Sequence, residues 1–190
     1  LFVKELEEAL LEERADIAIH SAKDLPSRMP PGLCLAAFPD RADCRDVLVA
    51  RDASMRLDQL PTGARVGTGS VRRTALLLAR RPDLEIVPLR GNVPTRLKKI
   101  ETENLDAVIL AGAGLDRLGL SDRICERLDP NVLLPAVAQG TLAIEMREGE
   151  SEWSESIREL DDPWLHCHGY QRIDALDCDA LLFSAEKVSR

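Results

Sequence analysis

The first eleven residues carry apolar side chains at Phe2, Leu6 and Leu10, and this spacing of four places them on one face of a helix. Short apolar runs follow the helix, each bounded by polar, glycine or proline residues, as is typical of buried strands. A polar turn, Ser21–Pro26, comes directly after the first of these runs. We expect the strands at Ala15–His20, Leu33–Phe38 and Asp46–Ala50.

From Met55 onward, segments of helical periodicity alternate with apolar runs of strand length. This alternation predicts a mainly parallel α/β sheet. Pro135–Gly140 has the composition of a crossover between elements. The expected strands are Ala64–Gly67, Glu85–Leu89, Leu105–Ala111 and Thr141–Met146, and the expected helices are Met55–Leu60, Ser70–Arg81, Val93–Thr102, Ala113–Leu118 and Ser151–Leu160.

The composition is that of a soluble globular protein, with 45% hydrophobic and 31% charged residues. No apolar run approaches the roughly 20 residues of a membrane span, and no signal peptide is visible. Five cysteines without regular spacing fit a reducing compartment better than a disulfide framework. We therefore expect a cytoplasmic protein that does not enter a membrane.

Positive charge is concentrated in one segment of an otherwise acidic chain. Between Arg65 and Lys99 there are nine basic and two acidic residues, a net charge of +7, whereas the whole chain carries −8. A basic segment on an acidic background predicts a focused anion site rather than a generally adhesive surface. We expect its ligand to be an anion with several negative groups.

The segment Gly67–Ser70 leads from an expected strand into an expected helix, and Ser70 is a candidate N-cap. Backbone N–H groups at such a junction favour anions, and Arg72 and Arg73 add charged donors suited to carboxylate or phosphate. The loop lacks the Gly-Lys-Ser/Thr ending of a Walker A motif. An ordinary capped helix with surface arginines is the alternative interpretation.

A second basic junction lies between Arg90 and Arg96, with Asn92 as a candidate cap and Pro94 in the first helical turn. Two such junctions in one domain favour an anion site over unrelated surface arginines. Nucleic acid is the competing ligand for a basic segment, but this segment contains no Phe, Tyr or Trp on which bases could stack. The chain has no helix-turn-helix or zinc-finger pattern either, so we expect no nucleic-acid partner.

The turn after the first expected strand is the candidate catalytic element, because α/β domains usually place ligand groups after strands. In it, Asp24 stands beside Lys23, a cation that favours an ionised carboxylate. Such a carboxylate can stabilise a developing positive charge or transfer a proton. A turn aspartate that bonds its own backbone is an equally open interpretation.

The tripeptide His166-Cys167-His168 is the one sequence that suggests a metal site. Adjacent residues rarely all point at one ion, and no further Cys or His lies at zinc-finger spacing, since Cys178 is alone. We therefore expect no metal ion.

Several segments together resemble the porphobilinogen deaminase (hydroxymethylbilane synthase) family. They occur in the family's order and at about its spacing, and the resemblance covers residues 1–160. The segments that carry it are Leu1–Glu7, His20–Pro26, Gly67–Arg73, Leu89–Leu97, Ala113–Gly119 and Leu134–Gly140.

This resemblance implies a transferase of tetrapyrrole and haem biosynthesis that joins four porphobilinogen units into hydroxymethylbilane and releases ammonia at each step. It implies an α/β fold with two periplasmic-binding-protein-like lobes around a cleft, and a dipyrromethane cofactor. Asp24 would be the catalytic carboxylate, which contacts pyrrole N–H groups and stabilises the cationic azafulvene. Substrate and cofactor are expected at Lys23, Ser70, Arg72, Arg73, Arg90, Arg96, Arg117 and Gln139, the last of these near the hinge between the lobes.

The resemblance also divides the chain into a partial first lobe at 1–42 with 138–161 returning to it, a second α/β lobe at 43–137 that carries the arginines, and an atypical tail at 162–190. The family has residues before the Leu1 segment, so we expect the first lobe to be incomplete, and the family's third domain is not recognisable. The family's cofactor cysteine follows paired glycines, and no Gly-Gly-Cys occurs here. Neither Cys167 nor Cys178 has that context, so no attachment cysteine is assigned.

Two other functions stay open at this point. The chain could be a catalytically inactive fragment that only binds polycarboxylate pyrroles through its second lobe, or a solute-binding module of the same fold. For the enzyme, the expected partner is the small molecule porphobilinogen, without nucleic acid or membrane, and we expect a monomer.

Overall fold

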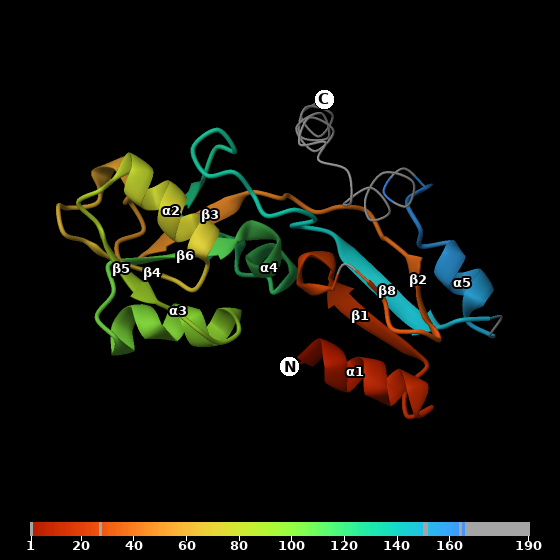
Figure 1. Ribbon diagram of the computed structural model, residues 1–190. Helices are drawn as coiled ribbons and strands as arrows, with labels where there is room; N and C mark the ends of the chain where they lie inside the picture. Colours follow the sequence, from red (N-terminus) through yellow and green to blue (C-terminus); the bar gives the residue numbers. More distant parts are fainter. Residues whose placement is uncertain (1, 27, 150–151, 164, 166–190) are drawn as a thin grey trace. The chain divides into compact units, whose positions relative to one another are not determined.

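The computed structural model of the protein describes residues 2–26, 28–149, 152–163 and 165. It divides into two compact units, which we call unit 1 (Leu1–Ala42 with the chain from Thr141) and unit 2 (Asp43–Gly140). No helix among the described residues is long and apolar enough to cross a membrane. The elements, drawn in Figure 1, are α1 (Phe2–Leu11), β1 (Ile17–Ser21), η1 (Ala22–Asp24), β2 (Leu33–Ala37), β3 (Asp46–Ala50), η2 (Leu57–Gln59), β4 (Arg65–Thr68), α2 (Val71–Arg80), β5 (Glu85–Pro88), α3 (Val93–Thr102), β6 (Ala107–Ala111), α4 (Gly112–Arg117), η3 (Ser121–Arg123), β7 (Glu126–Arg127), β8 (Leu142–Arg147) and α5 (Ser154–Arg158).

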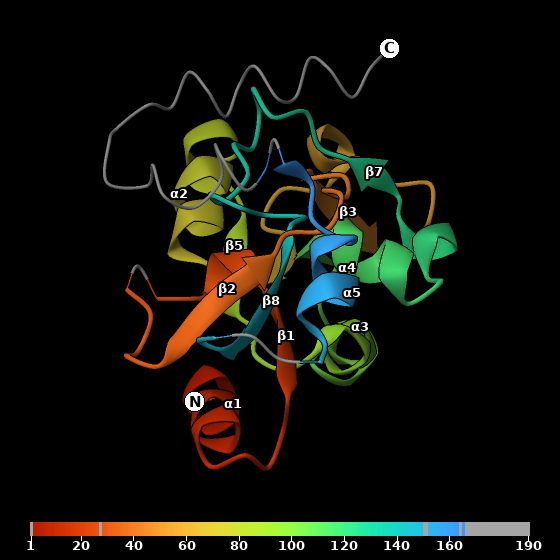
Figure 2. The ribbon, with the colours of Figure 1, turned by 90° about the vertical axis from the view of Figure 1, so that its right-hand side faces the viewer.

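Unit 1 contains a three-stranded sheet in the order β1-β8-β2, and both of its pairings are antiparallel. Leu10 of α1 packs with Ala18 and Leu33 on one face, whereas Ile157 of α5 packs with Ile144 on the other. Side chains alternate along a strand, so these two clusters occupy opposite faces, as the positions of α1 and α5 in Figure 2 illustrate. The three strands of this sheet are therefore antiparallel throughout.

Unit 2 contains a five-stranded sheet in the order β5-β4-β6-β3-β7. β4 pairs in parallel with β5 and β6, but β3 pairs antiparallel with β6 and with β7. The α/β fold class is therefore confirmed, whereas only three strands of this sheet run parallel. The periodicity of side chains locates strands but does not encode their direction, and for this reason the sequence-based expectation missed the reversal of β3.

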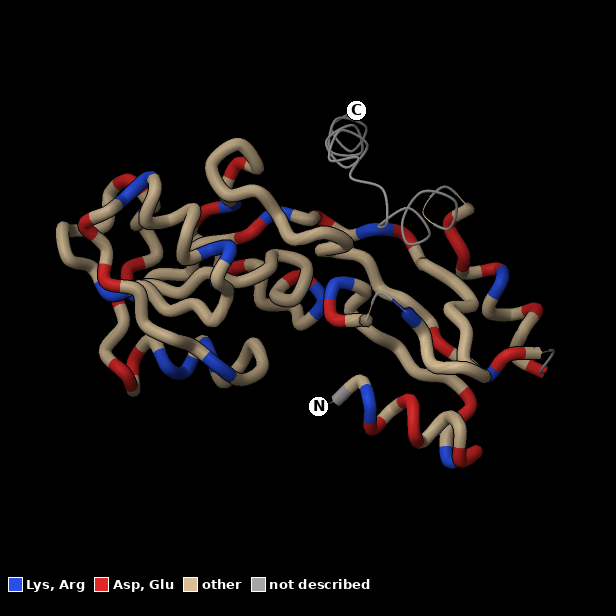
Figure 3. The backbone as a smooth tube through the Cα atoms, viewed as in Figure 1, with Lys and Arg blue, Asp and Glu red and all other residues tan. Residues whose placement is uncertain are grey.

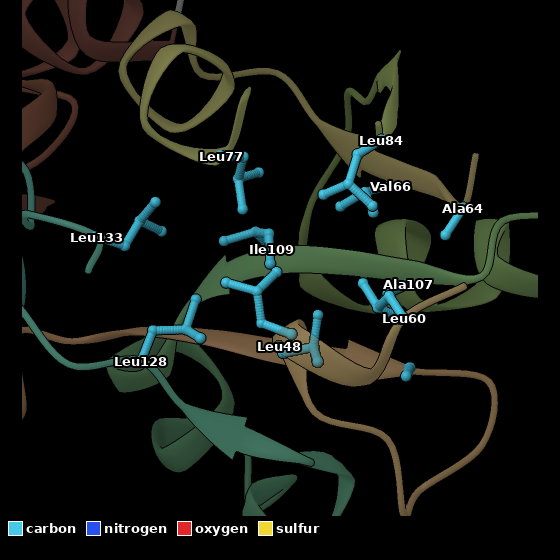
Figure 4. Packing of buried hydrophobic residues seen from close by; sticks show 12 residues of the cluster. Leu48, Leu60, Ala64, Val66, Leu77, Leu84, Ala107, Ile109, Leu128 and Leu133 are labelled. Carbon is cyan, nitrogen blue, oxygen red and sulfur yellow. The ribbon is translucent and has the colours of Figure 1, made fainter. Parts of the chain in front are cut away.

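Both faces of the unit 2 sheet are buried. Leu48 and Ile109 pack with Leu77 of α2 on one face (Figure 4), and Val49 packs with Leu97 of α3 on the other. All five residues of β3 are buried, which explains why this strand is a continuous apolar run after its first residue. The two helices thus cover opposite faces and bring their amino ends to the sheet's edge.

The expected helix starts are confirmed at both basic junctions. Ser70 Oγ accepts a hydrogen bond from the backbone N–H of Arg73 at 3.4 Å, and Asn92 Oδ1 accepts one from Thr95 N at 3.0 Å. Such caps satisfy N–H groups that have no partner within the helix. Two expected helices are shorter than predicted: 55–60 contains only η2, and 151–160 contains only α5 among its described residues.

Candidate functional site

The basic residues predicted to bind ligand in unit 2 follow the carboxyl ends of its parallel strands. Arg72 follows β4, Arg90 follows β5, and Arg117 ends the helix that follows β6. Because β3 runs antiparallel, its first residue, Asp46, pairs with Ala111 at the end of β6 and lies at the same edge. In open α/β sheets this is the edge at which ligands bind.

Asp46 is the centre of a buried hydrogen-bond network at this edge, and it is fully buried itself. Its Oδ2 accepts from Arg72 Nη2 at 2.7 Å, and its Oδ1 accepts from Arg73 Nη2 at 2.6 Å and from Arg73 Nε at 3.1 Å. Gln139 Nε2 also donates to Oδ1, at 2.8 Å. The sequence analysis did not identify Asp46. The available signal was a carboxylate at the first position of a buried apolar strand, because such a group requires hydrogen-bonding or charged partners.

The two neighbouring arginines have different surroundings. Arg73 is 5% exposed, and its Nη1 donates to the carbonyl of Ile109 at 3.1 Å, so its guanidinium lies inside the protein. The Arg72 side chain is 25% exposed, and its Nη1 donates to the carbonyl of Leu134. A guanidinium has five N–H donors, and the hydrogen bonds of Arg72 within the described residues use two of its nitrogens, so it retains donors for a ligand.

Of the remaining predicted arginines at this edge, Arg90 and Arg117 are exposed and Arg96 is half-buried. Arg90 is exposed and makes no hydrogen bond or ion pair with any described residue. Arg96, in the first turn of α3, donates from Nε to the carbonyl of Gly91 at 2.6 Å, and Arg117 Nη2 donates to the carbonyl of Gly140 at 2.6 Å. Gln139 and Gly140 are the last residues of unit 2.

Only part of the basic segment belongs to this edge. Arg80 pairs with Asp58 at 2.8 Å and Arg81 pairs with Asp83 at 2.7 Å, both at the carboxyl end of α2. Figure 3 shows basic and acidic positions interspersed over unit 2. The net charge of the segment therefore overstates the size of the anion site, because these arginines are neutralised by their own neighbours.

An ion-pair network holds α4, the helix that ends in Arg117. Arg127 Nη2 donates to Asp116 Oδ1 at 2.7 Å, and Arg127 Nη1 lies 3.2 Å from Asp43 Oδ2. The hydrogen bond from Arg127 keeps the pKa of Asp116 below its usual value. The backbone that carries Arg117 is therefore anchored to β7.

In unit 1, the predicted catalytic residue Asp24 lies on η1, directly after β1. The turn is attached to the residue that precedes β8, because the N–H of Ala22 donates to the carbonyl of Thr141 at 3.0 Å. Asp24 and Lys23 are both exposed, and the Asp24 carboxylate makes no hydrogen bond or ion pair with the described residues. The bond to its own backbone that an ordinary turn aspartate forms is thus absent from the described part of the chain.

A buried pair of ionisable residues lies at the base of this turn. His20 Nε2 of β1 is 2.8 Å from Glu145 Oε2 of β8, and the two residues are 5% and 0% exposed. Burial raises the pKa of Glu145, and the nearby charge of Glu7 raises it further, whereas His20 opposes the shift. The pair joins the two strands where β1 leads into η1.

This pair predicts an unusual pH dependence of stability. Because folded Glu145 binds its proton more tightly than the unfolded chain does, the free energy of unfolding should fall as pH rises from the ordinary value of 4.5 through the raised pKa. Glu145→Gln removes this linkage, so its melting temperature should vary less with pH over this window. Glu8→Gln, at an exposed position of α1, is the control. A Glu145→Gln protein with the wild-type pH profile would contradict the prediction.

The metal and cofactor-cysteine candidates of the tail, His166-Cys167-His168 and Cys178, lie outside the described residues. Within the described part, no group of three or more His, Cys, Asp or Glu side chains could hold a metal ion. Cys34, Cys44 and Cys125 form no disulfide there.

Known protein structures share this fold at low sequence identity. A lipoprotein from Bacillus subtilis subsp. subtilis str. 168 matches with a TM-score of 0.53 and 14% identity, over 90% of this chain and 81% of that chain. An ancestral cationic amino acid solute binding protein matches with a TM-score of 0.51 and 15% identity, over 83% of this chain and 66% of that chain. These likenesses support the expected resemblance to solute-binding lobes.

Sequence comparisons are more specific. Residues 1–155 match the family model described as "Porphobilinogen deaminase, dipyromethane cofactor binding domain". Porphobilinogen deaminases of Syntrophotalea carbinolica and Roseiflexus castenholzii are each 55% identical, over 85% and 86% of this chain and 51% and 54% of the relatives. The chain thus spans about half the length of the curated relatives it matches. Its sequence therefore confirms the resemblance, and the chain belongs to the porphobilinogen deaminase family.

Proposed function

We propose that the protein joins porphobilinogen units into hydroxymethylbilane with release of ammonia, in tetrapyrrole biosynthesis. The observation that carries this proposal is the gathering of Arg72, Arg90 and Arg117 at one edge of the unit 2 sheet in a chain of this family. Each porphobilinogen unit brings two carboxylates, so a growing chain of such units is a polyanion. Arginine suits it, because a guanidinium binds carboxylate with two parallel hydrogen bonds.

The same donors fit the dipyrromethane group that the family uses. Its acetate and propionate groups require charged N–H donors. This edge supplies the remaining N–H groups of Arg72 and the exposed guanidinium of Arg90. The start of α2, capped by Ser70, adds the positive end of a helix dipole. Arg96 and Arg117 extend this donor set, and Lys23 supplies a further cation in unit 1. When bound, the cofactor provides the pyrrole to which the units are joined.

Asp24 has the properties of the catalytic carboxylate in this proposal. It is exposed at the end of β1, and none of its oxygens is used within the described residues. A carboxylate held on a turn at the end of a strand can stabilise the positive charge that develops as the substrate amine leaves. Binding through the arginines and charge stabilisation through Asp24 are therefore separable functions.

We also propose that the protein is a cytoplasmic monomer and that it binds no nucleic acid. Arg80 and Arg81 are paired with acidic side chains, which lowers the charge available to a phosphate backbone. The basic segment also contains no aromatic residue for base stacking.

Incubation of the purified protein with porphobilinogen tests the function. We expect consumption of porphobilinogen with release of ammonia, and Arg90→Gln should weaken porphobilinogen binding about tenfold or more, as when a hydrogen bond to a charged group is lost. Arg56→Gln, an exposed unit 2 arginine that follows the opposite end of β3, should leave affinity unchanged. Binding without turnover would instead support an inactive pyrrole-binding protein, and no binding would refute the proposal.

A further inference from the structure

We propose that Asp46 is a positioning residue for ligand binding, and that it acts by fixing the guanidinium of Arg72. Asp46 does not itself face the ligand, because it is fully buried. Its Oδ2 instead accepts a hydrogen bond from Arg72 Nη2 at 2.7 Å. This inference rests on the proposed function, in which Arg72 binds a carboxylate of the substrate or cofactor.

The electrostatics of the α2 amino end require a counter-charge. Arg72 and Arg73 are consecutive cations in the first turn of a helix, where the helix dipole is already positive. Arg73 is also buried, and a buried cation is costly unless it is paired and hydrogen-bonded. Within the described part of the chain, Asp46 provides the carboxylate that both guanidiniums contact.

The network leaves Arg72 and Arg73 with different roles. Nε, Nη1 and Nη2 of Arg73 all donate hydrogen bonds, to Asp46 and to the carbonyl of Ile109. Arg72 donates to Asp46 and to the carbonyl of Leu134, and its side chain is one-quarter exposed. A guanidinium held at two nitrogens loses little further freedom when a carboxylate binds its remaining donors. Arg72 is therefore the direct ligand, and Arg73 and Asp46 form its support.

Gln139 strengthens the argument for positioning. Its Nε2 donates both to Asp46 Oδ1 at 2.8 Å and to the carbonyl of Cys44 at 2.7 Å, and it is 1% exposed. The Asp46 carboxylate is thus restrained by the backbone preceding β3 as well as by two arginines. A restrained carboxylate can hold Arg72 in one orientation, as an outer-shell group does for a ligating side chain.

Asp46→Asn is the first test. The amide has nearly the same size but no charge, and its NH2 group would oppose an arginine N–H donor. We expect the affinity for porphobilinogen, measured by calorimetry, to fall about 10- to 100-fold. Asp58→Asn is the matched control, because Asp58 pairs with Arg80 at the carboxyl end of α2, whereas Arg72 lies at the amino end of that helix. The Asp58→Asn protein should bind porphobilinogen as tightly as the wild type.

A double-mutant cycle separates positioning from a general loss of stability. If Asp46 acts through Arg72, Asp46→Asn should cost less than about threefold in affinity when Arg72→Gln is already present. The inference would be overturned if the loss of affinity in the double variant equalled the product of the losses in Asp46→Asn and Arg72→Gln. It would also be overturned by an Asp46→Asn protein that binds porphobilinogen as tightly as the wild type. Failure of the wild-type protein to bind porphobilinogen would refute the proposed function, which is a distinct result.

A measurement on the wild-type protein covers the case in which Asp46→Asn does not fold. In an NMR titration of ¹⁵N-arginine-labelled protein with porphobilinogen, the Nε signal of Arg72, assigned by its loss in Arg72→Gln, should shift. The Arg73 signal should shift much less, because that side chain is buried against Asp46. The opposite order of shifts would overturn the assignment of roles.

Discussion

Asp24→Asn should abolish porphobilinogen turnover while leaving porphobilinogen binding nearly unchanged. In the proposed function, Asp24 supplies the negative charge for the cation formed when the amine leaves, and the substitution removes that charge; such groups contribute about 10²- to 10⁴-fold to rate. Affinity should be retained because the proposed carboxylate-binding arginines belong to unit 2, whereas Asp24 belongs to unit 1. Turnover is measured as ammonia release, and affinity by calorimetry.

The control for this substitution is Asp16→Asn. Asp16 is another exposed aspartate, just before β1 at the end opposite Asp24, and its carboxylate pairs with Arg147 at 3.1 Å. It should retain full turnover. Substantial ammonia release by the Asp24→Asn protein would remove Asp24 from its proposed role and leave the arginine site unaffected.

Gly69→Ala should disrupt the edge of the unit 2 sheet that we propose binds ligand. A Cβ on Gly69 would clash with the carbonyl oxygen of Leu89, which is backbone and cannot rotate away. The loops after β4 and β5 are already in contact there, since Leu89 N donates to the carbonyl of Thr68 at 3.2 Å. Separating them should cost about 1–3 kcal/mol of stability and displace Arg72 and Arg90. A lowered melting temperature together with weaker porphobilinogen binding is the expected result.

Gly114→Ala provides the comparison for this prediction. Its nearest new contact would be the Cγ2 atom of Val93 at 3.3 Å, a side-chain atom, and Ala favours the helical backbone of α4. This variant should keep a melting temperature and an affinity close to wild type. Equal effects of the two substitutions would show that the contact between the loops at Gly69 and Leu89 does not control the site.

The sequence predicted the helix starts of the candidate site better than it predicted the contacts inside it. Ser70 and Asn92 were recognisable as caps because a cap bonds an N–H only three residues away. Arg73 illustrates the opposite case: it is adjacent to Arg72 in sequence, yet it is buried while Arg72 is partly exposed. No local pattern distinguishes two consecutive arginines at the start of a helix.

The sequence by itself determined α1 to α4, the capped starts of α2 and α3, every strand except β7, and the family, because each depends on residues close together in the chain or on the order of motifs. Only the tertiary structure decided the direction of β3 and the position of Asp46. That residue meets Arg72 across 26 positions of sequence and Gln139 across 93. Contacts over such separations depend on which strands pair and in which register, and an antiparallel β3 places the carboxylate at the edge where the arginines begin.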